Sequence, residues 1–233
     1  NMSSAASTSF LPARIEGSTF VLINPRPQEC DEFLAMLYND HSAMKDLMFM
    51  TRHNVGGWTV EDAVKRRAFM EKINEDGAGL NCVVQMKDGS YAGVAGFRDL
   101  HWWNRSAEMG IILHPNSWGK GLATEIHYIF LKWAFEEQNL NRVEFKTSVS
   151  NEGMNFLCKD VMHAKLEGTI RDCFPSIDCT VFKPTVSGAE PADQGTVPLS
   201  EVTFTDVNLY SILKSEWPRA KESLLARMQK ATA

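Results

Sequence analysis

The chain has 233 residues, of which 44% are hydrophobic and 23% are charged, with a net charge of −5 and an isoelectric point near 5.7. These proportions are ordinary for a globular protein of one domain, and the acidic balance argues against nucleic acid as a partner. The sequence has no run of about 18 apolar residues, so we expect no membrane-spanning helix and no membrane partner.

The first twelve residues are small and polar, and they lack the basic start and apolar centre of a signal peptide. We therefore expect a flexible N-terminus at 1–12 and a cytoplasmic protein. The cysteines show neither a CxxC pair nor a zinc-binding spacing with histidine, which predicts reduced thiols and no metal site. They are Cys30, Cys82, Cys158, Cys173 and Cys179.

The first half of the chain alternates short apolar runs with helical patterns. Thr59 followed by Asp62 is typical of a helix start, and Asp88-Gly89 is a hairpin signal. In chain order we expect a strand at 19–23, a helix at 28–39, a Met-rich stretch at 44–50 that either covers a pocket or fills the core, a helix at 60–75, strands at 80–86, 91–99 and 106–113, and a connector at 100–104 that carries Trp102 and Trp103.

The second half begins with a glycine-rich turn, and the spacing of Leu122, Ile126, Phe130 and Trp133 predicts a helix over 122–138. It continues with a strand at 142–147, a short helix at 151–160, strands at 165–171 and 202–212, and a terminal helix from Ser215. Prolines and glycines punctuate 172–201, where we expect a loop-rich insert with one candidate strand at 179–182. This order predicts an α/β (α+β) fold, a mixed and mostly antiparallel sheet of about six to seven strands with helices on both faces, in a single domain over 13–233.

The glycine-rich turn, Trp118 to Ala123, lies between a strand and a helix. A helix start offers unpaired N–H groups and a partial positive charge, and Gly119 and Gly121 let the backbone approach an anion to which Lys120 adds charge. The alternative is a tight turn that needs glycine only for its backbone angles. The spacing fits neither GxxxxGK[ST] nor GxGxxG, so a nucleoside triphosphatase or a dinucleotide dehydrogenase is not supported.

The wider strings 107–115 and 118–125 resemble the GNAT superfamily of N-acetyltransferases, most closely the ribosomal-protein N-terminal acetyltransferase (RimJ/RimL-like) branch. The family pattern Gln/Arg-x-x-Gly-x-Gly/Ala is matched here by Trp118, Gly121 and Ala123. Segments 151–152, 166–171 and 207–218 match the same branch. The chain departs from the pattern at Trp118 and at 162–164, and it has no tyrosine on the short helix at 151–160.

The resemblance implies a GNAT-like fold and acetyl-CoA as the cofactor, with the amine attacking the thioester directly in a ternary complex. It implies cofactor contacts along the strand that ends at Leu113, in the glycine-rich turn and on the short helix. An ordinary helix cap is the alternative for Asn151. The implied cofactor residues are Ile111, Ile112, Leu113, Trp118, Gly119, Lys120, Gly121, Leu122, Ala123, Thr124, Asn151 and Asn155.

Glu108 is our candidate general base, and the alternative is a structural glutamate. Trp102 and Trp103 are candidates for the acceptor pocket, or else hydrophobic cover. The expected acceptor is a small-molecule amine or a peptide N-terminus, and the expected state is a monomer or a homodimer. Two other interpretations stay open: an acyl-CoA-binding module without catalysis, and an assembly protein that uses the insert at 172–201 as a partner surface.

Overall fold

The computed structural model describes residues 14–24, 26–47, 57–176 and 203–232. Eight strands form one sheet in the order β1-β2-β3-β4-β5-β6-β8-β7, in which every neighbouring pair is antiparallel except β5 and β6. The strands are β1 (Arg14–Glu16), β2 (Phe20–Ile23), β3 (Leu80–Met86), β4 (Tyr91–His101), β5 (Ser106–Leu113), β6 (Arg142–Ser148), β7 (Lys165–Ser176) and β8 (Thr203–Leu213). The predicted mixed, mostly antiparallel sheet is confirmed.

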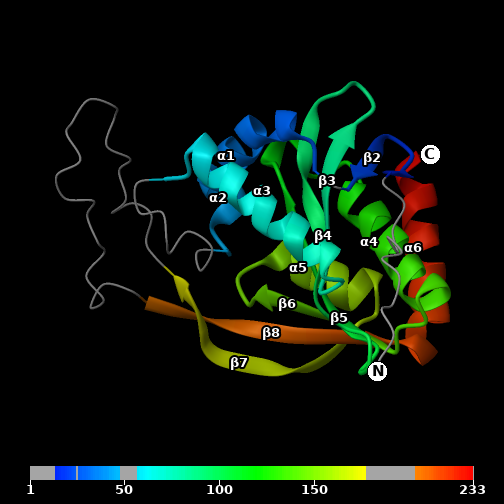
Figure 1. The fold of residues 1–233 in the computed structure, drawn as a ribbon. Coiled ribbons are helices and arrows are strands. Elements are labelled where there is room, and N and C mark those ends of the chain that lie inside the picture. The colour runs from blue at the N-terminus through cyan, green and yellow to red at the C-terminus, as the bar shows by residue number, and fades with distance from the viewer. Residues whose placement is uncertain (1–13, 25, 48–56, 177–202, 233) are drawn as a thin grey trace, which may run out of the picture.

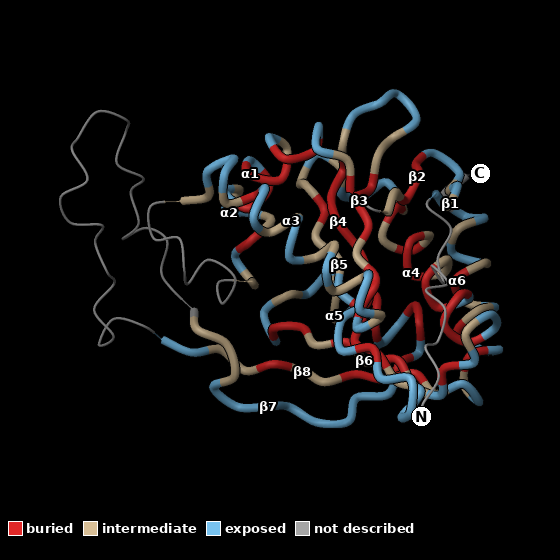
Figure 2. Tube along the Cα trace, viewed as in Figure 1, coloured by how far each residue is buried: buried red, intermediate tan, exposed pale blue. Residues whose placement is uncertain are grey.

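Helices cover both faces of the sheet (Figure 1). On one face α1, α2 and α3 pack over residues such as Val83 and Val94, and on the other α4, the α5 segment and α6 pack over their strand neighbours Cys82 and Ala95. The alternation of strand side chains thus feeds two separate cores, and Figure 2 shows the buried residues concentrated in the central strands. The helices are α1 (Asp31–Asn39), α2 (His41–Met44), α3 (Val60–Glu75), α4 (Leu122–Lys132), α5 (Glu152–Phe156) and α6 (Trp217–Thr232).

The helix starts follow the predicted local chemistry. Thr59 accepts from the Asp62 N–H at 3.2 Å, and Asp62 accepts from the Thr59 N–H at 3.0 Å, which is a reciprocal cap for α3. Helix α4 begins after Gly121 and continues through a π-helical turn to Glu137, close to the predicted end at 138. In the Met-rich stretch, Met44 fills the core and residues 48–50 lie outside the described residues.

Strands β1 and β7 differ from the prediction. The short strand β1 was not predicted, and β7 continues to Ser176, five residues into the expected insert, past a register shift and a left-handed Asp172 (φ 46°). Because β7 is the edge strand, it tolerates a bulge and Pro175 without loss of a ladder on its outer side. The candidate strand at 179–182 and the remainder of the insert lie outside the described residues.

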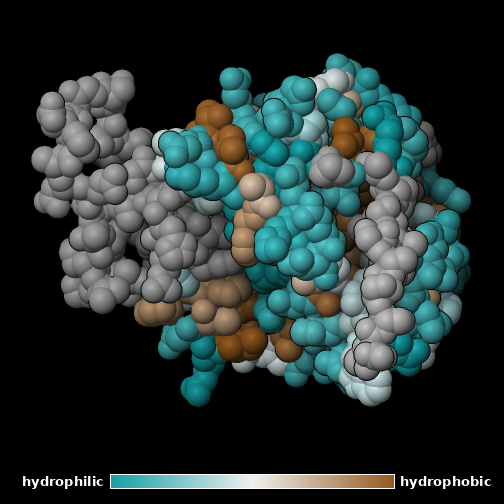
Figure 3. Space-filling view, in the orientation of Figure 1, coloured by the Kyte–Doolittle hydropathy of each residue, from teal (hydrophilic) through white to brown (hydrophobic). Residues whose placement is uncertain are grey.

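None of the helices in the described part of the chain is both long and apolar enough to span a bilayer. In the same residues no three His, Cys, Asp or Glu side chains converge as ligands for a metal ion. In the view of Figure 3 most of the described surface is hydrophilic, and hydrophobic residues gather at its lower edge over β7 and β8. Leu166, Ile170 and Phe204 are the large exposed hydrophobic residues of those two strands.

Candidate active site

The carboxyl ends of β5 and β6 separate, and the gap between them forms the centre of the candidate site. The two strands pair only at their starts, where Ser106 lies opposite Arg142 and Glu108 lies opposite Glu144. Beyond that point β5 runs on to Leu113 and β6 to Ser148 without pairing with each other. This leaves backbone hydrogen-bonding groups on that side of β5 without a strand partner.

The backbone groups of Ile111 and Leu113 face the gap. The His114 N–H donates to the Ala92 carbonyl at 2.8 Å, on the β4 side. Because the direction of backbone groups alternates along a strand, those of Ile112 also face β4, whereas those of Ile111 and Leu113 point away from it. The arrangement is compatible with the pantetheine contacts predicted at Ile111 and Leu113. Ile112 can contact a ligand only through its side chain, which packs against the α1–α3 core.

The glycine-rich turn lies at the end of β5 and has the backbone that an anion site requires. Gly119 (φ 72°) and Gly121 (φ 78°) both adopt the left-handed conformation, and a Cβ at Gly119 would meet no atom within 4 Å. Gly121 is the N-cap of α4 and has no side chain with which to bond the first N–H groups of the helix. Leu122 and Thr124 bury their side chains, so only their backbone is available to a ligand, while Lys120 is exposed. The turn therefore presents free donors and positive charge to solvent.

Trp118 lies across the open edge of β5. Its indole Nε1–H donates to the Leu113 carbonyl at 2.9 Å, while 47% of the residue remains exposed. The residue that departs from the family pattern thus occupies one of the acceptors predicted to hold the cofactor. A cofactor that bonds this carbonyl competes with the indole for it.

Two contacts hold the start of α4 in place. Glu125 in the first turn accepts from the Ser18 N–H at 2.6 Å and from the Ser18 hydroxyl at 2.5 Å, which ties the helix to the β1–β2 connection. His127 is completely buried, and its Nδ1 bonds the Ala123 carbonyl at 2.6 Å. Burial lowers the pKa of His127 to about 4, so the imidazole is neutral near pH 7.

Glu108 is buried in the middle of the sheet and is held by two cations. Its Oε1 accepts from Arg98 on β4, with Nε at 2.8 Å, and its Oε2 accepts from Lys146 on β6 at 2.8 Å. Arg98 lies directly opposite Glu108 across the β4–β5 pair. Sequence reasoning selected the carboxylate but missed both partners, because a register shift between Arg98 and His101 decides which β4 residue lies opposite Glu108.

Open space adjoins Glu108 on the α1–α3 face of the sheet. Glu108, Gly110 and Ile112 share that face, because alternate residues of a strand do so. Gly110 is exposed, and a Cβ built on it would meet nothing within 4 Å. The space therefore has a glycine floor between a charged and an apolar side chain, directly beside the gap between β5 and β6.

The two asparagines predicted at the short helix have structural partners. Asn151 Oδ1 caps α5 by accepting from the backbone N–H three residues further on, at 3.1 Å. Asn155 donates to the carbonyls of Ser148 (2.9 Å) and Asn151 (2.8 Å), and its Oδ1 accepts from Asn208 Nδ2 (2.9 Å) and the Tyr210 hydroxyl (3.1 Å). Asn155 thus joins α5 to the end of β6 and to the middle of β8. Cofactor contacts by both asparagines stay predictions.

A hydroxyl chain, which sequence reasoning missed, crosses the end of β6. Ser148 and Ser150 hydroxyls lie 2.7 Å apart, and the Ser150 hydroxyl donates to Asp46 Oδ1 at 2.8 Å. Asp46 follows α2, so this chain links the α1–α3 layer to the far side of the gap. Nothing in the local sequence around Asp46 indicates such a contact over 104 residues.

Trp102 and Trp103 lie in the β4–β5 hairpin, at the opposite end of β5 from the glycine-rich turn. Eight strand residues separate the two ends, which corresponds to roughly 25 Å. The Trp102 indole donates to the Gly77 carbonyl at 2.8 Å, and Trp103 is 97% exposed. The structure does not bring them together with the turn, and their contact with an acceptor stays a prediction.

Three cysteines are buried and poorly suited to nucleophilic attack. Burial raises the pKa of Cys30 to about 11 and that of Cys82 to about 12, and it raises the pKa of Cys158 as well. All three therefore remain thiols near neutral pH, whereas the thiolate is the reactive form.

Strand β5 ends at a glycine-rich helix start, beside the point where the parallel pair β5 and β6 separates. This arrangement matches a known family. Residues 19–160 fit the family model of the acetyltransferase (GNAT) domain. The chain belongs to the GNAT acetyltransferase family. The match includes every predicted cofactor residue, and GNAT acetyltransferases use acetyl-CoA.

Two named relatives agree with this family. One is the "Uncharacterized N-acetyltransferase p20" of Bacillus licheniformis, 30% identical over 115 residues that span 48% of this chain and 64% of that protein. The other is the "Putative ribosomal N-acetyltransferase YdaF" of Bacillus subtilis, 30% identical over 121 residues that span 48% of this chain and 66% of that protein. The chain thus spans slightly less than two thirds of each relative.

Solved structures share the fold over most of this chain. A crystal structure of a "putative acetyltransferase" is 25% identical with a TM-score of 0.67, covering 93% of this chain and 97% of that one. The microcin C7 self-immunity acetyltransferase MccE, in complex with acetyl-CoA and AMP, is 21% identical with a TM-score of 0.64, covering 88% and 98%. The spermidine N-acetyltransferase from Vibrio cholerae, in complex with CoA and spermine, is 20% identical with a TM-score of 0.63, covering 87% and 99%.

Proposed function

We propose that this protein transfers the acetyl group of acetyl-CoA to a primary amine by direct attack in a ternary complex. The observation that carries the proposal is the junction of three features at one gap. An uncapped helix start with two left-handed glycines, an unpaired strand edge and a buried carboxylate beside open space all meet where β5 and β6 separate. Membership of the GNAT family identifies acetyl-CoA as the cofactor.

The N-terminus of α4 supports binding of the cofactor pyrophosphate. The N–H groups of Leu122, Ala123 and Thr124 belong to the first turn, which lacks intrahelical partners, and Lys120 adds a positive charge. From that point the pantetheine arm would enter the gap and bond the free backbone groups of β5. The thioester then reaches the middle of the strand, near Gly110.

The acceptor approaches from the α1–α3 face, where the space over Gly110 is open. Its ammonium group first loses a proton to a base, and the neutral nitrogen then attacks the thioester carbonyl carbon. A carbon–nitrogen bond forms and the carbon–sulfur bond breaks. The nitrogen loses a second proton, and the departing CoA thiolate takes one up. Holding the two reactants in one gap supplies much of the rate enhancement.

Glu108 is the proposed base, acting directly or through a water molecule. It lies on the same strand face as the open space, next to Gly110. Its Oε1 accepts two N–H groups of Arg98, whereas Oε2 accepts only from Lys146 and retains a lone pair that can take up a proton. Buried Cys82 and Cys158 remain as thiols, which favours direct attack over an acyl-cysteine intermediate at either residue.

The proposed acceptor is a small-molecule amine or a peptide N-terminus. A relative named as a ribosomal N-acetyltransferase favours the peptide, and a fold neighbour that holds spermine favours the small molecule. The proposal therefore includes both acceptor classes, the small-molecule amine and the peptide N-terminus.

Release of the CoA thiol tests the function, measured with acetyl-CoA and a panel of amines and peptides. Replacement of the base, Glu108→Gln, should lower kcat by about 100-fold and leave the dissociation constant for acetyl-CoA within about threefold. Glu136→Gln is the matched control, because Glu136 also holds a lysine at 2.8 Å but lies on the α4–α6 side. Binding of acetyl-CoA without any thiol release would contradict transfer and leave an acyl-CoA-binding module.

A further inference from the structure

Two arginines on the α1–α3 face, the buried Arg26 and the partly buried Arg66, have buried guanidinium nitrogens without an acceptor. Arg26 is only 6% exposed, and its Nε and Nη1 atoms are buried with no hydrogen-bond partner. The buried Nε of Arg66, on α3, is also unpartnered. Among the described residues neither side chain forms an ion pair. Buried polar groups are normally satisfied, and a buried cation without a partner costs several kcal/mol, so these donors require an explanation.

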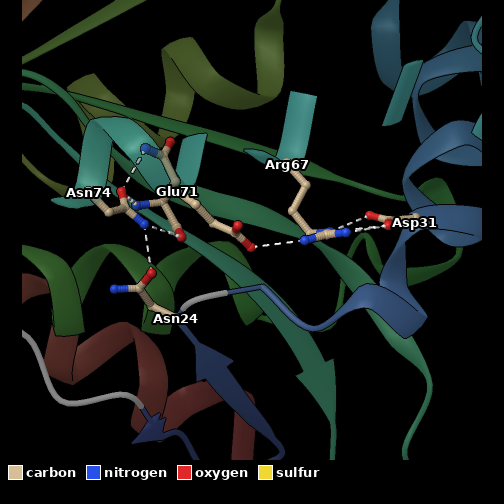
Figure 4. A network of polar contacts seen from close by, with 6 residues as sticks. Asn24, Asp31, Arg67, Glu71 and Asn74 are labelled. Atoms are coloured by element: carbon tan, nitrogen blue, oxygen red, sulfur yellow. Dashed lines mark hydrogen bonds and ion pairs between the residues drawn. The ribbon is translucent and has the colours of Figure 1, made fainter. Parts of the chain in front are cut away.

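Carboxylates in this layer already bind other cations. Asp31 binds the neighbouring Arg67 through Nε at 2.8 Å and Nη2 at 3.0 Å, and Glu71 binds the same guanidinium at 3.1 Å (Figure 4). Glu108 is held by Arg98 and a lysine. The layer between α3 and the sheet therefore contains more cations than its carboxylates neutralise.

The unpartnered donors belong to one neighbourhood. Burial lowers the pKa of Arg66, and the positive charges of Arg26 and Arg98 lower it further, whereas Tyr38 raises it through a hydrogen bond. The Tyr38 ring lies 4.7 Å from that of Trp58, whose indole Nε1 is another buried donor without an acceptor. The Tyr38 side chain thus satisfies part of the Arg66 guanidinium, whereas Arg66 Nε, Trp58 Nε1 and the Nε and Nη1 of Arg26 have no acceptor.

This neighbourhood adjoins the proposed acceptor space. Arg98 lies within electrostatic range of Arg66 and is paired with Glu108, which borders the open space over Gly110. The cationic layer under α3 and the proposed reaction centre are therefore neighbours on one face of the sheet. An amine positioned over Gly110 can extend a second group toward α3.

We propose that Arg26 and Arg66 bind an oxyanion of the acceptor, so that the substrate is an amine that also carries a carboxylate or a phosphate. This inference rests on the proposed acetyl transfer. A guanidinium binds either oxyanion through paired N–H groups, which makes carboxylate and phosphate one recognition chemistry. A polyamine, which carries only positive charge, would instead place an ammonium group beside unpaired guanidiniums.

Matched acceptors test the inference within one protein sample. We would compare kcat/KM for phosphoethanolamine with that for ethanolamine, and for glycine with that for glycinamide, with spermidine as the polycation. In the wild type the oxyanion member of at least one pair should be favoured by about 100-fold. Which pair shows the preference distinguishes phosphate from carboxylate.

Arg26→Met and Arg66→Met should each reduce the ratio of kcat/KM values within the favoured pair from about 100 to between about 1 and 3, because the oxyanion then loses its charge-assisted hydrogen bonds. The control is Lys65→Met, which removes one positive charge from the exposed side of α3 and should leave the ratio unchanged. Without ligand, Arg26→Met should melt at a temperature equal to or above that of the wild type, because it removes an unpaired buried charge.

Inorganic phosphate titrated calorimetrically into the CoA-loaded protein gives a readout that needs no turnover. Saturable binding in the wild type and in Lys65→Met, lost in both arginine variants, supports the inference even if none of these amines is a substrate. A wild-type ratio near one with no arginine-dependent phosphate binding overturns it, and so does a ratio that survives both arginine substitutions. If acetyl-CoA itself fails to bind, the proposed function falls, and a titration with phosphate alone still decides whether the anion site exists.

Discussion

Acid should destabilise this protein through His127, a residue of α4 that is buried in the core. The imidazole is completely buried and packs 5.9 Å from the Phe145 ring. Its Nδ1 carries the proton, because it bonds the Ala123 carbonyl, which can only accept; Nε2 has no partner. Protonation would place a charged Nε2–H in the core with nothing to receive it.

The size of the effect follows from the pKa of His127, which burial lowers from 6.5 to about 4, partly opposed by the Ala123 carbonyl. The unfolded chain binds the proton at higher pH than the folded one. The stability that the folded protein has with a neutral His127 is therefore fully present above about pH 6.5 and is lost as the pH falls toward 4. The free energy of unfolding should decrease by about 2 kcal/mol at pH 5 and about 3 kcal/mol at pH 4 from this residue alone.

Urea unfolding of the wild type and His127→Asn between pH 8 and pH 4 measures this loss. Asparagine keeps a donor near the position of Nδ1–H and does not titrate in that range. All other ionisable groups are common to the two proteins, so their contributions cancel in the difference. The stability advantage of the wild type should shrink by about 3 kcal/mol between pH 8 and pH 4. Two parallel curves would refute the reasoning.

Two further substitutions test the site. Trp118→Phe removes the indole donor from the Leu113 carbonyl and should tighten acetyl-CoA binding by about fivefold, the value of one ordinary hydrogen bond; weaker binding by calorimetry would show instead that the indole contacts the cofactor. Asn155→Leu removes the acceptor of the buried Tyr210 hydroxyl and of the Asn208 amide and should cost about 2–4 kcal/mol of unfolding free energy in urea, so a loss below about 1 kcal/mol would contradict the proposed joint between α5 and β8.

The glycine-rich turn could be predicted from the sequence because its chemistry is local. Two glycines and a helical apolar pattern within about twenty residues determine both the left-handed angles and the start of α4. The β3–β4 hairpin, signalled by Asp88-Gly89, was accessible for the same reason. The end of β7 was not, since Pro175 is typical of a loop unless the strand is known to lie at the edge of the sheet.

The electrostatics of the site depend on contacts that no local pattern reveals. Lys146 reaches Glu108 only after the chain has crossed through α4 and returned in parallel. Helix α3 was predicted from its cap, but the inward position of Arg66 was hidden because apolar residues do not line one face of that helix. From the sequence alone, an arginine that points inward is predicted to lie at the surface, because the elements that pack around it are not yet known.

Calorimetric titration of acetyl-CoA into the wild type and Gly121→Trp tests the central claim most directly. Gly121 has φ 78° and opens α4, so a large L-residue there strains the backbone and fills the place of the pyrophosphate. The account predicts saturable one-site binding by the wild type and at least a 100-fold loss in the variant. Absence of binding by the wild type at millimolar cofactor, or equal affinity in the two proteins, would contradict it.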